Sequence, residues 1–472
     1  MVKWFQKGTR GATWPWWSSC VTCACLTAAL LLVSGPSAYT RSVHEGVTVR
    51  GVPIPAFARK YNLPCSACHT AWPELNAFGQ RFRDNGYQLM NDRDSPIWQN
   101  PSYIPVTFRM TPNLHRESLT NQPVDATPGD PTTTGPATVT LSGFDLSGMD
   151  LWTAGTLYKN ISFALLPSSD NTGAFHFEAA FVRFDNLLNN HWVNFKFGKF
   201  ELDNLISEKR FLFLSGNGGT YQSYHFVPVG ETLNAFGLGD NQIGAELAGH
   251  SENSYTRYGV AVLSSSDGDV NLPTSQRYDA FVTVSHAIDA GALGVERLGA
   301  YAYLGQRPTY YQTSGSAPIA GTGTGNKPFY RIGVSGDFFF GDFELLPFFM
   351  HASDNAYLAT GTAATAALPP GARDARWNAG FLEAHYYVSP QLVFTGRYET
   401  IRMSQQADPA TLSDLGNIDG YSGGIRWYPI MFARAGLSWH TEVSAIRTRG
   451  STFSPTDAVW NASVFTGFDF DF

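Results

Sequence analysis

Charged residues, long apolar runs and an excess of basic side chains are all missing from this sequence. Asp, Glu, Lys and Arg make up 15% of the 472 residues, against roughly a quarter in an ordinary soluble domain. No stretch reaches the ~20 apolar residues that a transmembrane helix needs, which excludes a helical-bundle membrane protein. The formal net charge of −7 argues against a nucleic-acid-binding surface, so we expect no nucleic-acid partner.

Aromatic and turn-forming residues are abundant instead. Phe, Tyr and Trp make up 14% of the chain, which also holds 46 Gly and 27 Pro. Many aromatics, frequent turns and few charges, without long apolar runs, indicate a β protein that faces a solvent other than water.

The N-terminus has the pattern of a secretory signal peptide. Three basic residues precede an apolar run over residues 20–33. That run is too short to span a bilayer comfortably, but it suits the apolar core of a signal. Small residues follow it and predict cleavage near Ala38. We therefore expect residues 1–38 to be a signal peptide and the mature protein to be exported.

The cysteines beyond this signal form one motif, Cys65-Ser66-Ala67-Cys68-His69. Two thiols three positions apart can form thioether bonds to the two vinyl groups of one haem, with the adjacent His placed to bind the iron. A zinc site would need a second pair of Cys or His ligands, and no further Cys follows. A thioredoxin-like pair would need a βαβ context, which is missing. The motif predicts one haem c on Cys65 and Cys68, with His69 as axial ligand.

The residues after the motif predict a short helix. Pro73 suits the first turn of a helix, and Asn85-Gly86 supplies a stop. Gly79 would allow close approach to a flat ring. We expect residues 39–100 to be a mono-haem cytochrome c domain, which is too small to bury much core without the haem. The apolar residues at helical spacing are Leu75, Phe78 and Phe82.

The distal iron ligand is less constrained by the sequence. Met90 directly follows the helix stop and is the ligand that we predict. His44 and His115 are alternatives, as is an open or water-bound position. A Met ligand would favour a high reduction potential.

From residue 101 onward, apolar and polar residues alternate with a period of two, as in β-strands. The connections are alternately short and long, which is typical of outer-membrane barrels. The chain ends on a segment with Phe at alternate positions up to Phe472. We therefore expect residues 101–472 to form an all-β transmembrane barrel of about 16 antiparallel strands, porin-like and embedded in outer-membrane lipid. The predicted segments are 103–111, 147–157, 161–168, 174–184, 191–200, 241–249, 255–264, 277–287, 296–306, 329–340, 343–352, 377–387, 391–400, 419–428, 432–447 and 457–472.

The barrel prediction also gives a set of inward-facing charges and a set of long connections. The inward charges could line a solvated pore, bind a plug or guide ions, and the sequence leaves these roles open. The charges predicted to point inward are Arg109, Lys196, Arg397, Glu399, Arg426, Arg434 and Glu442. The long connections are 112–140, 201–240, 307–327, 353–375 and 402–418.

A haem motif ahead of a barrel resembles the outer-membrane fused mono-haem cytochrome c–porin family, whose best-known members are Fe(II) oxidases. Over the barrel the likeness is only architectural. The motifs that carry the resemblance are Pro55-Ala56-Phe57-Ala58-Arg59, Cys65-Ser66-Ala67-Cys68-His69, Pro73-x-Leu75-Asn76-x-Phe78-Gly79, Phe82 and Asn85-Gly86-Tyr87.

The resemblance implies a small α-helical haem unit in the barrel lumen, with Cys65 and Cys68 anchoring the haem and His69 as proximal ligand. It further implies that extracellular Fe(II) gives one electron to the haem, and that a periplasmic c-type cytochrome or another carrier accepts it. No bond of a substrate is made or broken, so no catalytic residue is assigned.

Three other functions stay open at this stage. The first is a porin whose haem-containing plug acts as a gate or redox sensor, and the second is a conduit for another electron donor. The third is a thiol-redox plug without haem.

Overall fold

The computed structural model describes residues 56–61, 63–89, 106–127, 129–169, 174–210, 212–231, 234–266, 268, 278–308, 312–314, 317–319, 326–362, 367–431 and 436–471. The chain divides into two compact units, and all described residues belong to the second, which begins at Gly51. The predicted signal peptide, His44, Met90 and Arg434 lie outside the described residues.

Short helices come first along the described chain, and strands follow. The helices are α2 (Ala56–Tyr61), η1 (Cys65–Ala67), α3 (Ala77–Asp84), η2 (Leu187–Asn189), η3 (Gly291–Leu293) and α4 (Ala356–Ala359). The strands are β1 (Thr107–Thr127), β2 (Asp130–Tyr158), β3 (Ile161–Ser169), β4 (Phe175–Phe184), β5 (Asn194–Phe200), β6 (Gln242–His250), β7 (Thr256–Ser264), β8 (Tyr278–Asp289), β9 (Val295–Pro308), β10 (Gln312–Ser314), β11 (Ala317–Ile319), β12 (Asn326–Phe340), β13 (Phe343–Asp354), β14 (Ala375–Ser389), β15 (Leu392–Gln405), β16 (Ile418–Met431), β17 (Gly436–Arg449) and β18 (Ala458–Asp471). Among the described helices, none is both long and apolar enough to cross a membrane.

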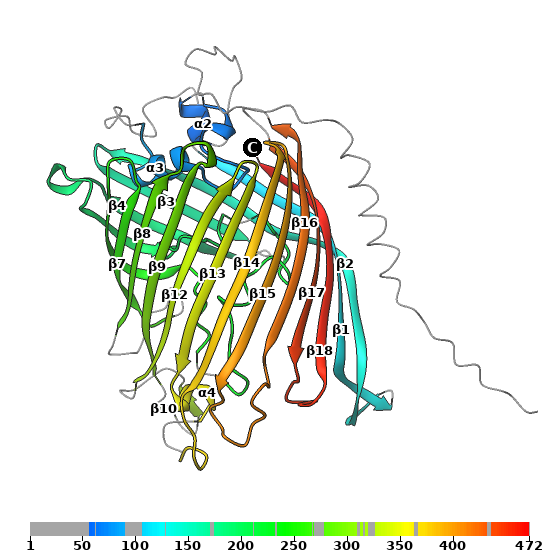
Figure 1. Ribbon diagram of the computed structural model, residues 1–472. Helices are drawn as coiled ribbons and strands as arrows, with labels where there is room; N and C mark the ends of the chain where they lie inside the picture. Colours follow the sequence, from blue (N-terminus) through cyan, green and yellow to red (C-terminus); the bar gives the residue numbers. More distant parts are fainter. Residues whose placement is uncertain are drawn as a thin grey trace, which may run out of the picture. The chain divides into compact units, whose positions relative to one another are not determined.

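In the described part of the chain, sixteen antiparallel strands close into one barrel, as the sequence predicted (Figure 1). Neighbouring strands in the sequence pair with each other, and β1 pairs with β18 to close the ring. Strands β10 and β11 form a separate two-stranded sheet within the connection from β9 to β12. Closure gives every wall strand a hydrogen-bonded neighbour on both sides over part of its length, which is the condition for crossing a bilayer with strands.

The wall strands present apolar side chains outward. On β8, Phe281 faces inward and is fully buried, whereas the next residue, Val282, is 47% exposed. On the last strand, Asp469 is buried inside and Phe468 is exposed outside. An apolar outer face on a closed barrel suits lipid, where a charge costs ~2–4 kcal/mol at the midplane. The chain is a barrel of the bacterial outer membrane, and its low charge content follows from that solvent.

The first barrel hairpin differs from the sequence prediction. Residues 112–140 were expected to be a long loop, but β1 and β2 continue through most of this range and turn at Gly129, which has φ +82°. The pairing of β1 with β18 stops at Leu119, so the rest of the hairpin extends as a two-stranded ribbon. Many Thr residues in this stretch have β-branched side chains that favour strands, which explains why a polar segment forms a ladder here.

The long connection between β5 and β6, residues 201–240, packs against the inner face of the barrel wall; we call it the luminal segment. Its Tyr221 stacks on Phe381 of the wall with ring centroids 4.4 Å apart. Its Phe236 lies 4.1 Å from the Tyr303 ring. Both luminal side chains are at most 2% exposed, and full burial of one such side chain stabilises a fold by ~1.5–3 kcal/mol. The segment is therefore packed core, not a mobile surface loop.

Inward-facing charges of the wall bind this luminal segment. The Glu399 carboxylate accepts hydrogen bonds from the backbone N–H groups of Gln222 and Ser223 at 2.9 and 2.6 Å. Glu442 accepts two further backbone N–H groups, those of Leu214 and Ser215. Glu399 and Glu442 therefore hold the luminal segment in place, a role that the sequence did not predict for them.

Candidate functional site

The cysteine motif folds as a single helical turn. Cys65–Ala67 forms the 3₁₀ turn η1, and the backbone N–H groups of Cys68 and His69 donate to the Cys65 carbonyl at 3.1 and 3.0 Å. Residues three apart eclipse one another in such a turn, so the two cysteines lie on one side of it. No disulfide joins Cys65 to Cys68. The two thiols and the imidazole of the predicted site are therefore held together within five residues.

Asn76 ties this turn to helix α3. Its side-chain Nδ2 donates to the carbonyl oxygens of Ser66 and Ala67 at 3.3 and 3.1 Å. Its Oδ1 accepts the Gly79 N–H at 2.9 Å, which caps the N-terminus of α3. The Asn76 N–H also donates to the Cys68 carbonyl at 3.0 Å. One side chain thus fixes both the cysteine turn and the start of the helix.

One sequence prediction about these flanks was wrong. Pro73 does not occupy the first turn of a helix, because the Asn76 cap makes α3 begin at Ala77. Close approach of Gly79 to a flat ring stays a prediction, and the structure shows a second reason for this glycine in the backbone of the cysteine turn. A Cβ at Gly79 would lie 2.0 Å from the Cys68 carbonyl oxygen. The predicted helix stop is confirmed, since Asn85 is the C-cap of α3.

His69 has a fixed and partly shielded ring. Its Nδ1 lies 3.1 Å from the Glu74 carbonyl oxygen, and its ring stacks on Trp72 with centroids 5.6 Å apart. Burial lowers the pKa of His69 to about 4. The hydrogen bonds to the backbone of Glu74 and Pro73 oppose this shift but are outweighed by it. The imidazole is therefore neutral near pH 7. A main-chain acceptor at Nδ1 fixes the tautomer in which Nε2 carries the lone pair that binds a metal.

The Cys68 thiol lacks the lowered pKa of redox-active cysteines. Burial raises the pKa of Cys68 to about 11, and the neighbouring Cys65 adds to the rise. Reactive cysteines have lowered pKa values, because the thiolate is the nucleophile. The motif is poorly suited to thiol–disulfide exchange.

An aromatic cluster packs the helices against the wall. Phe57 of α2 stacks on Tyr87, with ring centroids 5.1 Å apart, and makes edge contacts with Phe82 at 5.1 Å and with Trp152 of β2 at 5.5 Å. These residues belong to the motifs that carry the family resemblance, apart from Trp152. In this chain they join the helices to the barrel.

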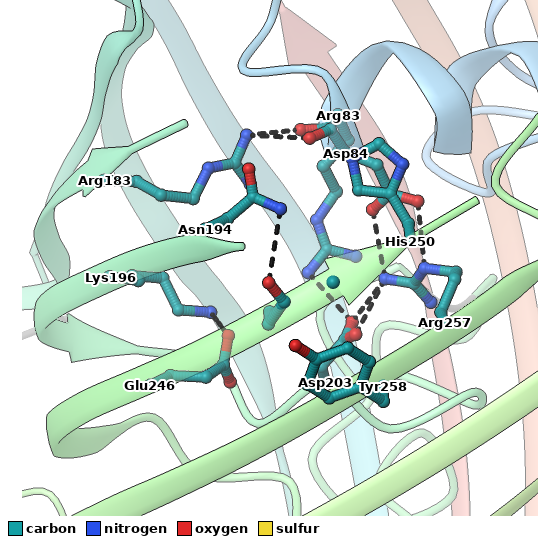
Figure 2. A pocket seen from close by; sticks show the side chains of 12 residues that line it. Arg83, Asp84, Arg183, Asn194, Lys196, Asp203, Glu246, His250, Arg257 and Tyr258 are labelled. Atoms are coloured by element: carbon teal, nitrogen blue, oxygen red, sulfur yellow. Dashed lines mark hydrogen bonds and ion pairs between the residues drawn. The ribbon is translucent and has the colours of Figure 1, made fainter. Parts of the chain in front are cut away.

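Helix α3 is also joined to the barrel by a network of ion pairs, which we call the charged junction (Figure 2). Asp84 of α3 binds Arg257 of β7 at 2.9 Å, and Arg257 binds Asp203 of the luminal segment at 2.7 Å. Arg183 of β4 donates to the backbone carbonyl of Arg83 at 2.7 Å. Burial raises the pKa of Asp84, but Arg257 outweighs it and holds that pKa below 3.8. Breaking such a buried pair typically costs ~3–5 kcal/mol.

Other contacts locate the cysteine motif at the end of the barrel where the short turns lie. Gln88 donates to the carbonyl of Lys159, which is in the turn between β2 and β3, at 2.9 Å. The Tyr387 hydroxyl, near the end of β14, donates to Glu74 Oε2 at 2.5 Å. The Tyr428 hydroxyl donates to the Trp72 carbonyl. Helices α2 and α3 and the C-terminus lie at this same end (Figure 1). Short turns of outer-membrane barrels face the periplasm.

The predicted ligands are only partly described. Cys65, Cys68 and His69 lie together, whereas Met90 and His44 lie outside the described residues. His115, the other alternative, lies on β1 with its Nε2 3.1 Å from Glu117. Sequence reasoning missed the partners of the motif on the wall, because no local pattern links residues hundreds of positions apart. Those partners include Arg183, Arg257, Tyr387 and Tyr428.

Comparisons with known proteins find the barrel and nothing of the motif. No protein-family model and no curated protein matches the chain. Solved structures with a similar fold include the outer-membrane channel DcaP of Acinetobacter baumannii, at 12% identity and a TM-score of 0.47, over 78% of this chain and 97% of that one. The anion-selective porin from Comamonas acidovorans matches at 11% identity and a TM-score of 0.46, over 78% and 99%. OmpT of Vibrio cholerae in its trimer form matches at 10% identity and a TM-score of 0.44, over 78% and 99%.

Proposed function

We propose that this chain is an outer-membrane electron conduit that carries one c-type haem on the Cys65–His69 turn. It would take one electron from extracellular Fe(II) and pass it to a periplasmic carrier. The observation that carries the proposal is the arrangement of His69, whose Nδ1 is held by a main-chain carbonyl beside two cysteines of the same turn. The choice of Fe(II) as donor rests on the family resemblance.

The residues present fit a covalently held haem. Cys65 and Cys68 would form the thioether bonds, and His69 would be the axial ligand through Nε2. The haem would supply a one-electron redox centre. Asn76 and Gly79 keep the turn in shape, and the Glu74 carbonyl orients the imidazole. Such outer partners of a ligating His fix its ring and raise its basicity.

The surroundings of the motif support transfer of electrons over passage of solutes. The motif lies at the end of the barrel with the short turns, where a periplasmic partner could approach. The luminal segment is packed into the barrel and bound by the wall residues Glu399 and Glu442. A lumen that holds this segment is a narrower route for solutes than an open barrel.

The test is reduction of the purified full chain by Fe(II) in an anaerobic stopped-flow instrument. We expect a haem that stays bound under denaturing conditions, and a shift of its α-band to the reduced form when Fe(II) is mixed in. Dithionite reduction serves as the control for a redox-competent haem. A haem that dithionite reduces but Fe(II) does not would refute Fe(II) as donor. Absence of covalent haem would refute the conduit itself.

A further inference from the structure

Three ligand-type side chains meet where the cysteine motif contacts the wall; we call them the Glu74–Glu344–His385 cluster. Glu74 comes from the segment that follows His69, Glu344 from β13 and His385 from β14. One ligand atom from each lies within 4.8 Å of the other two. Glu344 and His385 are directly opposite in the β13–β14 register, and both are at most 2% exposed. The cluster is therefore built by the wall and completed by the N-terminal segment.

The distances in this cluster suit one small metal ion. The Nδ1 atom of His385 lies 3.0 Å from Glu344 Oε2 and 3.4 Å from Glu74 Oε1. Ligand atoms that bind one first-row cation at ~2.0–2.2 Å are themselves ~3.0–3.5 Å apart when they occupy adjacent positions. The observed separations fall in that range, so little movement would be needed to bind the ion.

The other nitrogen of His385 has the partner that metal-binding histidines use. Its Nε2 lies 2.7 Å from Glu383 Oε1, and the Glu383 carboxylate is held by Arg397 at 3.2 Å. A carboxylate on one ring nitrogen keeps the proton there and leaves a lone pair on the other. With the proton on Nε2, the lone pair of His385 would be on Nδ1, which faces the carboxylates of Glu74 and Glu344. A metal ion between these three groups would take the place of a proton on Nδ1.

The cluster also has more carboxylates than cationic side chains. In the described part of the chain, no Lys or Arg forms an ion pair with Glu74, Glu344 or Asp337, and His385 is the base that contacts Glu74 and Glu344. The Tyr387 hydroxyl contacts both Glu74 and Glu344, but it has only one proton to donate. Asp337 of β12 contacts Glu344, and its Oδ1 is buried without a hydrogen-bond partner. Buried carboxylates that outnumber their cationic partners are costly, and a divalent ion would offset that cost.

We propose that Glu74, Glu344 and His385 bind one divalent first-row transition-metal ion. The mixed oxygen and nitrogen ligands favour Mn(II), Fe(II) or Zn(II) over Ca(II), which prefers oxygen alone. Because Glu74 belongs to the segment of the cysteine motif, the ion joins that segment to the barrel wall. The proposal does not depend on the identity of the electron donor.

Binding of Mn(II) to the purified full chain tests the proposal. Bound Mn(II) loses the sharp six-line electron paramagnetic resonance signal of the aqueous ion, so free and bound metal are counted directly. We expect one site in the wild type and an affinity at least tenfold lower in Glu344→Gln and His385→Asn. Glu252→Gln, which removes an exposed carboxylate from a short turn, should bind as the wild type does.

Two further measurements keep the test decisive. Heat-modifiable migration in gel electrophoresis reports whether each variant forms a folded barrel. Tyr387→Phe removes the hydroxyl that contacts both carboxylates, and we expect it to retain Mn(II) binding, since the cation replaces that proton. A folded wild type that binds no Mn(II), or variants at Glu344 and His385 that bind it unchanged, would overturn the proposal. This outcome is independent of whether Fe(II) reduces the haem.

Discussion

Asn76 shows how much one side chain can determine at the residue scale. It caps helix α3 through Oδ1 and holds the cysteine turn through Nδ2. Gly79 supports the same turn, since only a residue without Cβ lets α3 approach the Cys68 carbonyl. Both residues lie in the stretch that resembles the haem-binding family. Their physical role in this chain is to shape the turn that holds the thiols.

The two functions of Asn76 can be separated by substitution. Asn76→Asp keeps an acceptor for the Gly79 N–H but removes both Nδ2 donors. Asn76→Ala removes the cap as well, which typically costs a further ~1 kcal/mol. We expect less covalent haem per barrel in Asn76→Asp and less again in Asn76→Ala, measured by pyridine haemochrome assay. Equal haem content in all three proteins would show that the turn does not need Asn76.

Gly79→Ala places a methyl group against backbone. The added Cβ would lie 2.0 Å from the Cys68 carbonyl oxygen, so α3 must move away from the cysteine turn. Overpacking of this kind costs ~1–3 kcal/mol. We expect a loss of attached haem in folded barrels. Gly143→Ala is the matched control, because nothing lies within 4 Å of its added Cβ. Wild-type haem content in Gly79→Ala would contradict the packing argument.

At the scale of elements, α3 depends on the charged junction for its position. The helix has only eight residues, which is too short to be stable alone in water. Its last turn supplies Asp84 to Arg257, and the luminal segment supplies Asp203 to the same guanidinium. Arg257 of β7 thus binds two elements, α3 and the luminal segment, that are distant from each other in the sequence. Docking of the helix and packing of the lumen are coupled through it.

This junction predicts how docking of α3 depends on pH. The pKa of folded Asp84 lies below its ordinary value of 3.8, so its ion pair stabilises docking fully above about pH 4. That stabilisation is lost as the pH falls through the folded pKa. We expect hydrogen exchange of the α3 amides, corrected for intrinsic rate, to accelerate only below pH 4.

Asp84→Asn provides the comparison for this pH dependence. It leaves the Arg257 guanidinium with one carboxylate fewer, and we expect fast α3 exchange at every pH from 2.5 to 7. Protection of α3 in Asp84→Asn equal to that in the wild type would mean that the aromatic cluster alone docks the helix.

At the scale of the whole molecule, the luminal segment limits the space inside the barrel through which solutes could pass. Sixteen-stranded barrels are wide enough for an aqueous channel. Here the segment is packed against the wall and bound by Glu399 and Glu442. The segment therefore narrows the lumen of a porin-like wall. The N-terminal segment is attached at one end of that wall.

Conductance in planar bilayers tests this narrowing. We expect the wild type to conduct far less than an open porin of the same strand number. The double variant Glu399→Gln and Glu442→Gln weakens five hydrogen bonds that the two carboxylates accept, each worth ~1.5–3 kcal/mol, and should conduct more. Glu252→Gln should match the wild type. Porin-like conductance of the intact wild type would favour the solute-passage alternative.

Several parts of this structure could be read from sequence because they depend on local patterns. The alternation of period two predicts the strand number, since lipid outside and packed residues inside alternate on every strand. The prediction failed at residues 112–140, where polar Thr residues form a ladder that hydropathy does not reveal. It also could not find Arg257 or His385 as partners of the N-terminal segment, because barrel closure alone brings them there.

The sequence by itself determined the location, the barrel and the cysteine turn, since each follows from composition, a short period or adjacent residues. Only the tertiary structure decided that residues 201–240 pack inside the barrel and that Glu399 and Glu442 bind them. It also decided that Glu74 meets Glu344 and His385. The physical reason is that antiparallel closure sets which inward side chains become neighbours. That register depends on the pairing of all the strands and not on any local pattern.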